Sequence, residues 1–219
     1  MNIEMDTLDI PNDDLTRLAV FGSGTGSNAE AIIEWSNDAT NQSPFTIVLI
    51  VSTSYEAGIN ALGAKHDIPV VVVPRSLDAQ AQTNVVCEAL RTYRVDLIAL
   101  AGYLRMIPSE VIQTVKGHLL NIHPSLLPAY GGKGMYGMAV HEAVLAAREA
   151  VTGATVHLVN ERYDDGHILA QQDVHVLPND DAQSLARRVL EVEHRLYPRT
   201  IAAYVRELRA NRMHQGSKP

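Results

Sequence analysis

Residues 18–28 read LAVFGSGTGSN, and this stretch indicates the class of fold. Its apolar start predicts a short buried strand from Leu18 to Phe21, which ends in a loop with three glycines. A helical pattern then continues to about Asn37. A strand, a glycine loop and a helix in direct succession begin a βαβ unit, in which the next strand returns parallel to the first.

The alternation of apolar runs and helical patterns continues along the chain. Four further apolar runs predict strands, over residues 46–53, 69–73, 96–101 and 119–123. Helices are expected over about 56–67, over 78–94 and from Pro108 onward, since proline suits the first turn of a helix. This order predicts right-handed crossovers and an α/β fold, with a Rossmann-like, mostly parallel sheet flanked by helices on both faces.

The pattern changes after residue 123. A loop over 124–137 contains four glycines and leads into a helix expected over 138–148. Two extended runs follow, 153–160 and 168–176, and a polar turn joins them. Such a pair predicts an antiparallel hairpin at the edge of the sheet rather than another crossover.

One domain is expected over residues 17–210. A chain of 219 residues with 46% hydrophobic content can bury one sizeable core. A long helical segment from 180 to about 210 closes this domain, and Pro198 is expected to break or kink it. The polar ends, residues 1–16 and 211–219, are expected to be a flexible lead and a flexible tail.

Charge and composition argue against several classes of function. The net charge of −7 and the pI near 5.7 disfavour a nucleic-acid partner held through its phosphates. Cys87 is the only cysteine, which excludes an internal disulfide, and it is expected in the core. No run approaches the roughly 20 apolar residues of a membrane span, and the acidic residues 1–17 are unlike a signal peptide. We expect a cytoplasmic protein, monomeric or homodimeric, with no membrane partner.

The glycine loop has the outline of a phosphate site. Gly26, Ser27 and Asn28 would gather free backbone N–H groups at the positive end of a helix dipole. A nucleoside-triphosphate loop needs a Gly-Lys-Ser/Thr ending, and no lysine occurs here. The dinucleotide fingerprint needs glycine at Ser27 and an acidic residue after the second strand, which ends VST instead. A phosphate monoester is the expected ligand, and a tight turn that binds nothing is the alternative.

A carboxamide and an imidazole stand together at the end of the strand over 119–123. Side chains alternate along a strand, so Asn121 and His123 point to one face while Ile122 points to the other. Pro124 cannot donate to a sheet ladder, so the strand should stop there. Open α/β sheets bind ligands at the carboxyl ends of their strands. This pair is therefore predicted to belong to an active site.

Asp164 and His157 are further candidates. Asp164 lies in the polar turn YDDGH between the two late strands, where polar residues are ordinary. It becomes a catalytic candidate only if the fold carries it to Asn121 and His123. His157, on the strand before this turn, is either structural or supports the site. The remaining histidines lack metal-ligand spacing, so no metal is expected.

Five short motifs together resemble the folate-dependent formyltransferases. They are GTGSN (24–28), AGYLRM (101–106), NIHPSLLP (121–128), YDDG (163–166), and EVEH (191–194) shortly before Tyr197-Pro198. The resemblance covers residues 17–207, and the Gly-Ser-Asn loop is similar to that of the branch that formylates glycinamide ribonucleotide. The loop over 129–137 departs from the pattern, since many members have Pro-Gly and a later histidine there, so no contact is carried over from it.

The resemblance implies transfer of a formyl group from 10-formyltetrahydrofolate, as co-substrate, to the amine of glycinamide ribonucleotide in purine biosynthesis. It assigns Asn121, His123 and Asp164 to catalysis, Gly26, Ser27 and Asn28 to the substrate phosphate, Glu193 to the ribose hydroxyls, and Arg105, Met106 and Ile107 with Asn121 to the folate. We hypothesise that Asp164 moves the proton, and that His123 stabilises developing negative charge as a cation.

Four other functions are alternatives. A methionyl-tRNA formyltransferase would be expected to add a C-terminal domain and a basic surface, and a formyltetrahydrofolate hydrolase an N-terminal regulatory domain. A nicotinamide-dependent oxidoreductase is opposed by the broken dinucleotide fingerprint. A catalytically idle nucleotide-binding module is opposed by the complete set of Asn121, His123 and Asp164.

Overall fold

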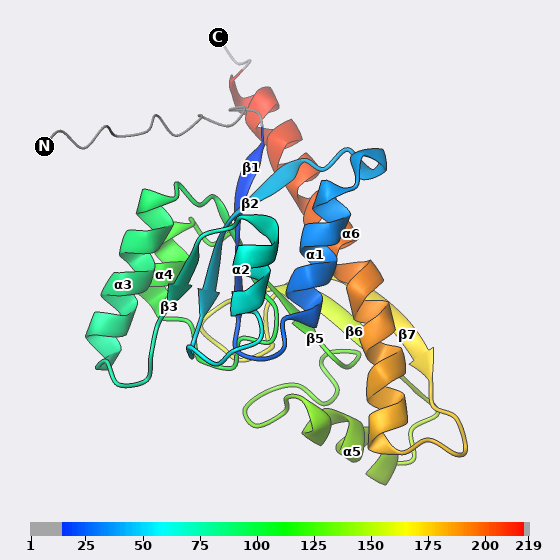
Figure 1. The fold of residues 1–219 in the computed structure, drawn as a ribbon. Coiled ribbons are helices and arrows are strands. Elements are labelled where there is room, and N and C mark those ends of the chain that lie inside the picture. The colour runs from blue at the N-terminus through cyan, green and yellow to red at the C-terminus, as the bar shows by residue number, and fades with distance from the viewer. Residues whose placement is uncertain (1–14, 217–219) are drawn as a thin grey trace, which may run out of the picture.

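A sheet of seven strands organises residues 15–216, the part of the chain described by the structure, which is a computed structural model (Figure 1). The strands are β1 Thr16–Gly22, β2 Phe45–Ser52, β3 Val70–Val72, β4 Leu97–Leu100, β5 Leu119–His123, β6 Val151–Leu158 and β7 Ile168–His175. They lie side by side in the order β3-β2-β1-β4-β5-β6-β7.

The pairing of these strands confirms the predicted fold. β1 to β5 pair in parallel, whereas β5 with β6 and β6 with β7 pair antiparallel, so the late hairpin forms one edge. The strand order reverses between β1 and β4, and ligands of open α/β sheets bind at such a reversal, beyond the carboxyl ends of the strands. The glycine loop follows β1, and the residues predicted to bind folate follow β4.

Helices cover both faces of the sheet. They are α1 Ser27–Asn37, α2 Asn60–His66, α3 Ala79–Thr92, α4 Ser109–Thr114, α5 Met138–Ala146 and α6 Ala182–Gly216, with a short 3₁₀ turn, η1, at Ala39–Asn41. Figure 1 shows α3 and α4 on one side of the sheet and α1 and α6 on the other. Leu18 and Val20 of β1 belong to the core under α1 and α6, while Ala19 and Phe21 belong to the core under α3 and α4. Burial on both faces explains why the strands read as continuous apolar runs.

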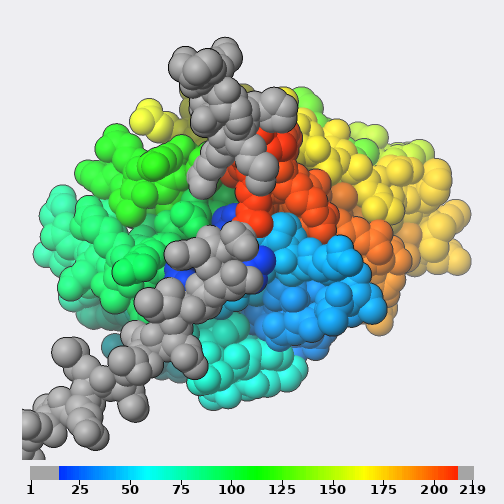
Figure 2. All heavy atoms as spheres, turned by 90° about the horizontal axis from the view of Figure 1, so that it is seen from above, coloured from blue at the N-terminus to red at the C-terminus, as the bar shows by residue number. Residues whose placement is uncertain are grey.

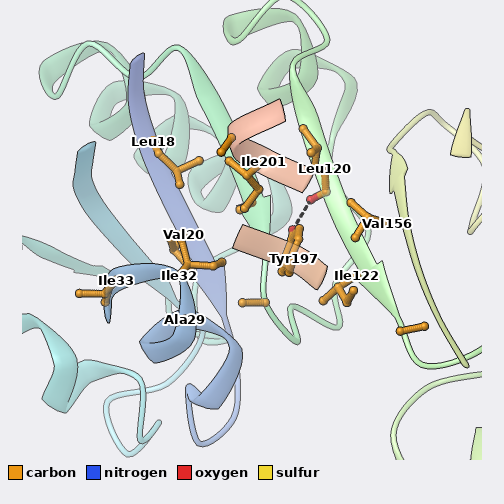
Figure 3. Packing of buried hydrophobic residues seen from close by; sticks show 14 of the residues in the cluster. Leu18, Val20, Ala29, Ile32, Ile33, Leu120, Ile122, Val156, Tyr197 and Ile201 are labelled. Atoms are coloured by element: carbon orange, nitrogen blue, oxygen red, sulfur yellow. Dashed lines mark hydrogen bonds between the residues drawn. The ribbon is translucent and has the colours of Figure 1, made fainter. Parts of the chain in front are cut away.

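Tyr197 fastens α6 to the middle of the sheet. Its fully buried hydroxyl lies 3.0 Å from the carbonyl oxygen of Leu100 and 2.9 Å from that of Leu120, and shares its proton between them. Figure 3 shows the contact with Leu120 inside the apolar cluster that includes Ile122 and Ile201. Figure 2 shows the C-terminal end of α6 in red between the blue segment that includes α1 and the yellow segment of the late hairpin. One helix thus packs against β5, β6 and β7 of the sheet and against α1.

The helix expected over 56–67 is too long in the prediction, since α2 begins only at Asn60. The Asn60 side chain donates to the carbonyls of Ser54 and Tyr55, which closes a turn instead. At Gly58 an added Cβ would lie 2.9 Å from the carbonyl oxygen of Thr25. The turn therefore packs directly against the glycine loop, and a helix starting at residue 56 would not allow this contact.

Two predicted boundaries near the C-terminus are also wrong. The strand expected over 153–160 is β6, Val151–Leu158, and the helix expected to end near 210 continues to Gly216. Pro198 lies inside α6 and does not break it, although the two halves of α6 run at an angle in Figure 1. A proline removes one backbone hydrogen bond and bends a helix, and packing on both sides keeps the helix continuous.

Parts of the predicted ends lie outside the described residues, namely 1–14 of the lead and 217–219 of the tail. β1 begins at Thr16, within the expected lead. Within residues 15–216 we find no helix whose length and apolar character would let it cross a bilayer.

Candidate active site

The end of β5 places Asn121 and His123 on one face, as their spacing predicts. β6 lies antiparallel beside β5, with His157 opposite Asn121 and Thr155 opposite His123. Residues directly opposite each other across two strands share a face. The register therefore brings His157 of β6 beside Asn121 and His123 of β5. His123 is 3% exposed and His157 2% exposed, so both rings are shielded from water.

Hydrogen bonds set the tautomer of His157 and, with it, the orientation of Asn121. His157 Nδ1 lies 2.8 Å from the carbonyl oxygen of Leu158, which can only accept, so Nδ1 carries the hydrogen. In the neutral ring Nε2 is then an acceptor, and it lies 3.2 Å from Asn121 Nδ2. Asn121 therefore turns its NH₂ group toward His157 and keeps a second N–H for another acceptor.

Asp164 lies between the two imidazoles. Its carboxylate oxygens are 3.7 Å from His123 Nδ1 and 3.6 Å from His157 Nε2, distances of ionic contact rather than of hydrogen bonds. The backbone N–H of Gly132 donates to Oδ2 at 2.8 Å. The structure thus assembles one cluster, which we call the β5–β6 corner and which consists of Asn121, His123, His157 and Asp164.

The turn after β6 is shaped to carry Asp164 inward. Asp164 has a φ of 53°, in the left-handed region that aspartate adopts more readily than most residues. At Gly166 an added Cβ would lie 1.6 Å from the carbonyl oxygen of Leu158, so only glycine fits there. The N–H of Leu158 donates to the carbonyl of His167 at 2.9 Å and closes the turn. The polar YDDGH sequence is therefore more than a connection between two strands.

Burial and neighbouring charges set the protonation of the corner. Burial lowers the pKa of His123 below its ordinary 6.5, and Asp164 and the Tyr130 carbonyl offset only part of this effect. Burial alone would raise the pKa of Asp164, but His157, the Gly132 N–H and His123 outweigh it and hold that pKa below its ordinary value. Near pH 7 the ligand-free site therefore holds a neutral His123 beside a carboxylate. The cationic His123 that we hypothesised is not the ligand-free state, because burial outweighs the charge of Asp164.

The glycine loop leaves the first turn of α1 open. Gly26 has a φ of 89°, and an added Cβ would lie 2.9 Å from Ile59 Cα, so the position requires glycine. No side chain caps this helix end. The backbone N–H groups of Ser27, Asn28 and Ala29 find no hydrogen-bond partner within residues 15–216. Free N–H groups at the positive end of a helix dipole form a site for an anion.

Asn28 meets Glu193 across 165 positions of the sequence. Its Nδ2 donates to Glu193 Oε2 at 2.7 Å. Glu193 is 6% exposed, and burial raises the pKa of its carboxyl to about 7, which the Asn28 amide opposes only in part. Asn28 Oδ1 and Ser23 Oγ are buried without a partner among the described residues. The residues predicted for phosphate and for ribose thus meet at one place, which we call the α1–α6 site: Ser27, Asn28 and Glu193.

The stretch predicted to bind folate lines a cavity of about 170 Å³ between the loop after β4 and α3. The Arg105 guanidinium donates to the carbonyls of Thr53 and Val73, at 3.1 and 3.0 Å, and so ties the loop to the ends of β2 and β3. Met106 is 58% exposed and Ile107 is buried. The position of this stretch beside a cavity agrees with a ligand site. The Arg105 guanidinium itself is bound to backbone carbonyls of the protein.

Sequence reasoning missed the loop that completes the β5–β6 corner. His123 Nε2 donates to the carbonyl of Tyr130 at 2.8 Å. The buried hydroxyl of Thr155 donates to the carbonyl of Ser125 at 2.6 Å and accepts from the N–H of Leu127 at 3.0 Å, which holds the start of this loop on β6. The glycines of residues 131–137 signal an unusual backbone, but a sequence does not show where backbone atoms point.

The arrangement suits transfer of an acyl group. It offers an N–H donor in a defined orientation at Asn121, an imidazole nitrogen without hydrogen at His123, and a carboxylate in contact with it. Such groups can stabilise an oxyanion and accept a proton. Within residues 15–211 no three His, Cys, Asp or Glu side chains are grouped to hold a metal ion.

This chain is similar to known formyl transferases. The family described as Formyl transferase matches residues 16–201. The chloroplastic phosphoribosylglycinamide formyltransferase of Arabidopsis thaliana is 44% identical over 87% of this chain, which spans 66% of that relative's length. The phosphoribosylglycinamide formyltransferase of Bacillus subtilis (strain 168) is 35% identical over 85% of this chain and 93% of its own length. The crystal structure of glycinamide ribonucleotide transformylase 1 from Symbiobacterium toebii is similar with a TM-score of 0.81, at 30% identity and 90% coverage of both chains.

Proposed function

The chain belongs to the formyl transferase family, and we propose that it transfers the formyl group of 10-formyltetrahydrofolate to the amine of glycinamide ribonucleotide. The names of the Arabidopsis and Bacillus relatives support this choice among the reactions of the family. The reaction would be a step of purine biosynthesis.

The position of Asp164 beside His123 carries the proposal. The carboxylate lies 3.7 Å from the ring nitrogen that bears no hydrogen, and 3.6 Å from the histidine that orients Asn121. Formyl transfer to an amine needs a donor for the carbonyl oxygen and an acceptor for the amine proton at the same place. The β5–β6 corner supplies both.

Asn121 stabilises the developing negative charge. When the amine attacks, a carbon–nitrogen bond forms and the carbonyl electrons move onto the formyl oxygen. The free N–H of Asn121 donates to this oxygen, and His157 holds the amide in the donating orientation. Removing one fixed donor of this kind typically costs about 10²–10³ in rate.

His123 and Asp164 handle the proton. The substrate amine resembles an α-amino group with a pKa of about 8, so part of it is neutral near pH 7 and can attack directly. The attacking nitrogen then becomes positively charged and strongly acidic. His123 Nδ1 accepts its proton, and the adjacent Asp164 carboxylate stabilises the resulting imidazolium. The proton passes to the folate nitrogen as the bond between that nitrogen and the formyl carbon breaks, which restores the neutral ring.

The α1–α6 site anchors the ribonucleotide. The phosphate of the ribonucleotide lies at the loop formed by Gly26, Ser27 and Asn28. It accepts from the open N–H groups in the first turn of α1. The ribose hydroxyls donate to Glu193, which binds them best as a carboxylate. The folate lies along Arg105, Met106 and Ile107, beside the cavity that these residues line, and reaches Asn121 with its formyl group.

An acceptor test separates this function from its rivals. The protein is incubated with 10-formyltetrahydrofolate and either glycinamide ribonucleotide, initiator tRNA or buffer alone, and the loss of formylfolate is followed by absorbance. We expect turnover only with the ribonucleotide. Loss in buffer alone would identify a hydrolase, transfer to tRNA a methionyl-tRNA formyltransferase, and no loss in any mixture would refute formyl transfer.

We propose that the protein works in the cytoplasm, as a monomer or homodimer, and without a metal. The plant relative named above is chloroplastic, so an organelle is the competing compartment. Fluorescence microscopy of the tagged full chain, analytical ultracentrifugation, and turnover after treatment with EDTA test these three points. Organellar fluorescence, a larger assembly or loss of turnover would each refute one of them.

A further inference from the structure

The loop over residues 130–132 touches both proton-handling groups with its backbone. The carbonyl of Tyr130 accepts from His123 Nε2 at 2.8 Å, and the N–H of Gly132 donates to Asp164 Oδ2 at 2.8 Å. These two backbone groups are close in sequence, yet one partner comes from β5 and the other from the turn after β6. The loop therefore connects the two halves of the β5–β6 corner.

We propose that the backbone of Tyr130–Gly132 is a positioning element, which selects the tautomer of His123 and holds the Asp164 carboxylate beside the ring nitrogen that exchanges a proton. The role of the proton in catalysis rests on the proposed function. The two contacts and their effect on protonation do not depend on that function.

The first contact decides which nitrogen of His123 exchanges its proton. A carbonyl oxygen can only accept, so the bond to Tyr130 places the hydrogen of the neutral ring on Nε2. Nδ1 is then the nitrogen that can gain a proton, and it is the one that faces Asp164 at 3.7 Å. Without the Tyr130 carbonyl, the neutral ring would place its hydrogen on Nδ1 and donate it to Asp164. The nitrogen would then be blocked as an acceptor.

The second contact keeps Asp164 ionised in a buried place. The charged and titratable groups that face the carboxylate are His123 from β5 and His157 from β6, and His123 in turn acts on His141 of α5. Burial opposes the charged form, and the Gly132 N–H is one of the contacts that hold the pKa of Asp164 low. Losing this donor would raise that pKa and let the carboxylate turn away from His123.

The loop has the conformation and the anchors that this role needs. Tyr130 and Gly132 both have positive φ, 56° and 94°, which points the carbonyl and the N–H toward the corner. The Tyr130 hydroxyl donates to Glu149 at 2.8 Å, and its ring packs against the core. At Gly131 an added Cβ would lie 3.3 Å from Asp164 Cβ and 2.5 Å from Leu127 Cδ2. The absence of a side chain at residue 131 therefore allows the backbone to reach Asp164.

Gly131→Ala tests the proposal, and Gly134→Ala is its matched control. Gly134 lies in the same loop with a φ of 91°, and an added Cβ there meets no atom within 4 Å. The control therefore strains the same loop without pushing it from Asp164. We expect Gly131→Ala to lose about 10²-fold in kcat, since small displacements of catalytic groups have effects of this size, with little change in KM for the ribonucleotide. Gly134→Ala should keep a kcat near wild type.

Two NMR measurements on the ligand-free protein test the contacts without any reaction. The ¹⁵N spectrum of wild-type His123 should show the hydrogen on Nε2 in the neutral ring. The ¹³C titration of the Asp164 carboxyl should give a higher pKa in Gly131→Ala than in wild type or Gly134→Ala.

The outcomes separate the role of the loop from formyl transfer itself. A hydrogen on Nδ1 in the wild type would overturn the proposal, and so would an unchanged Asp164 titration in a folded Gly131→Ala. If Gly131→Ala does not fold by circular dichroism, the wild-type tautomer decides alone. If the wild type transfers no formyl group, the proposed function fails, and the NMR results still decide the role of the loop.

Discussion

The two sites at the carboxyl edge of the sheet are completed to different degrees before any ligand binds. In the β5–β6 corner, His123, His157 and Asp164 each have partners within the protein, and Asn121 has one for its amide nitrogen. In the α1–α6 site the first turn of α1 is open and Asn28 Oδ1 has no partner among the described residues. Glu193 lies buried there, and burial raises its carboxyl pKa to about 7.

This difference separates positioning from binding. Catalytic groups act only when they are held in place, so the protein satisfies them itself and fixes their geometry in advance. A binding site gains affinity when the ligand satisfies groups that the protein leaves without partners. Substitutions in the β5–β6 corner should therefore lower kcat, whereas those in the α1–α6 site should change affinity and stability.

The largest expected effect is at Asp164. Asp164→Asn should reduce kcat at least ~100-fold with little change in KM, because the amide cannot stabilise the imidazolium. The control is Asp165→Asn on the same turn, since Asp165 is exposed, its carboxylate pairs with the exposed Arg162, and the Asn160 side chain contacts only its backbone carbonyl. Steady-state kinetics of both variants check this contrast. Equal losses, or near-wild-type turnover in Asp164→Asn, would remove Asp164 from the mechanism.

The next effect is on binding. Asn28→Ala should weaken ribonucleotide binding about 10- to 100-fold, the range for one hydrogen bond to a charged group, and leave kcat nearly unchanged. Asn84→Ala on the exposed face of α3 is the control. Isothermal titration with glycinamide ribonucleotide measures both affinities. An unchanged affinity in Asn28→Ala would contradict the division into binding and catalytic regions.

Ionised Glu193 should lower the stability of the folded protein and strengthen the binding of the ribonucleotide. Its carboxyl has a pKa of about 7 in the folded protein, against an ordinary 4.5. Between pH 4.5 and pH 7 the folded protein therefore keeps the proton on Glu193, whereas the unfolded chain has lost it. Stability should therefore fall as pH rises from 4.5 to 7. Glu193→Gln removes this ionisation and should raise the unfolding free energy at pH 8 by about 2–3 kcal/mol, with weaker ribonucleotide binding.

Urea unfolding at pH 5 and pH 8 measures this effect, with the exposed neighbour Glu191→Gln as control. The stability difference between Glu193→Gln and wild type should be larger at pH 8 than at pH 5. A difference that does not grow with pH would show that Glu193 is already ionised in the folded protein at low pH.

The smallest effect concerns the protonation of His123. Burial lowers its pKa and Asp164 raises it, so Asp164→Asn should lower it further. Proton NMR titration of the ring in ligand-free wild type and variant checks the sign. His118 serves as internal reference. It precedes β5, and its Nδ1 lies 2.9 Å from the Tyr204 hydroxyl. A higher pKa in the variant would mean that Asp164 does not act on this ring.

The sequence predicts the fold well because the same physical signal repeats in every element. Continuous apolar runs such as residues 46–53 require burial on both faces, and glycine after the first strand marks the crossover. Asn121 and His123 follow from strand alternation, and Asp164 from the resemblance alone. The part played by Tyr130 and Gly132 was not predictable, since it depends on the direction of two backbone groups and not on side chains. The protonation of His123 in the ligand-free protein was not predictable either, because it depends on burial that only packing reveals.

A double-mutant cycle on His123 and Asp164 tests most directly that the β5–β6 corner acts as one unit. Single-turnover formyl transfer is measured for wild type, His123→Ala, Asp164→Asn and the double variant. Groups that share one proton lose their function together, so the double variant should be scarcely slower than the slower single variant. Losses that multiply would show two independent contributions and refute a single unit of His123 and Asp164.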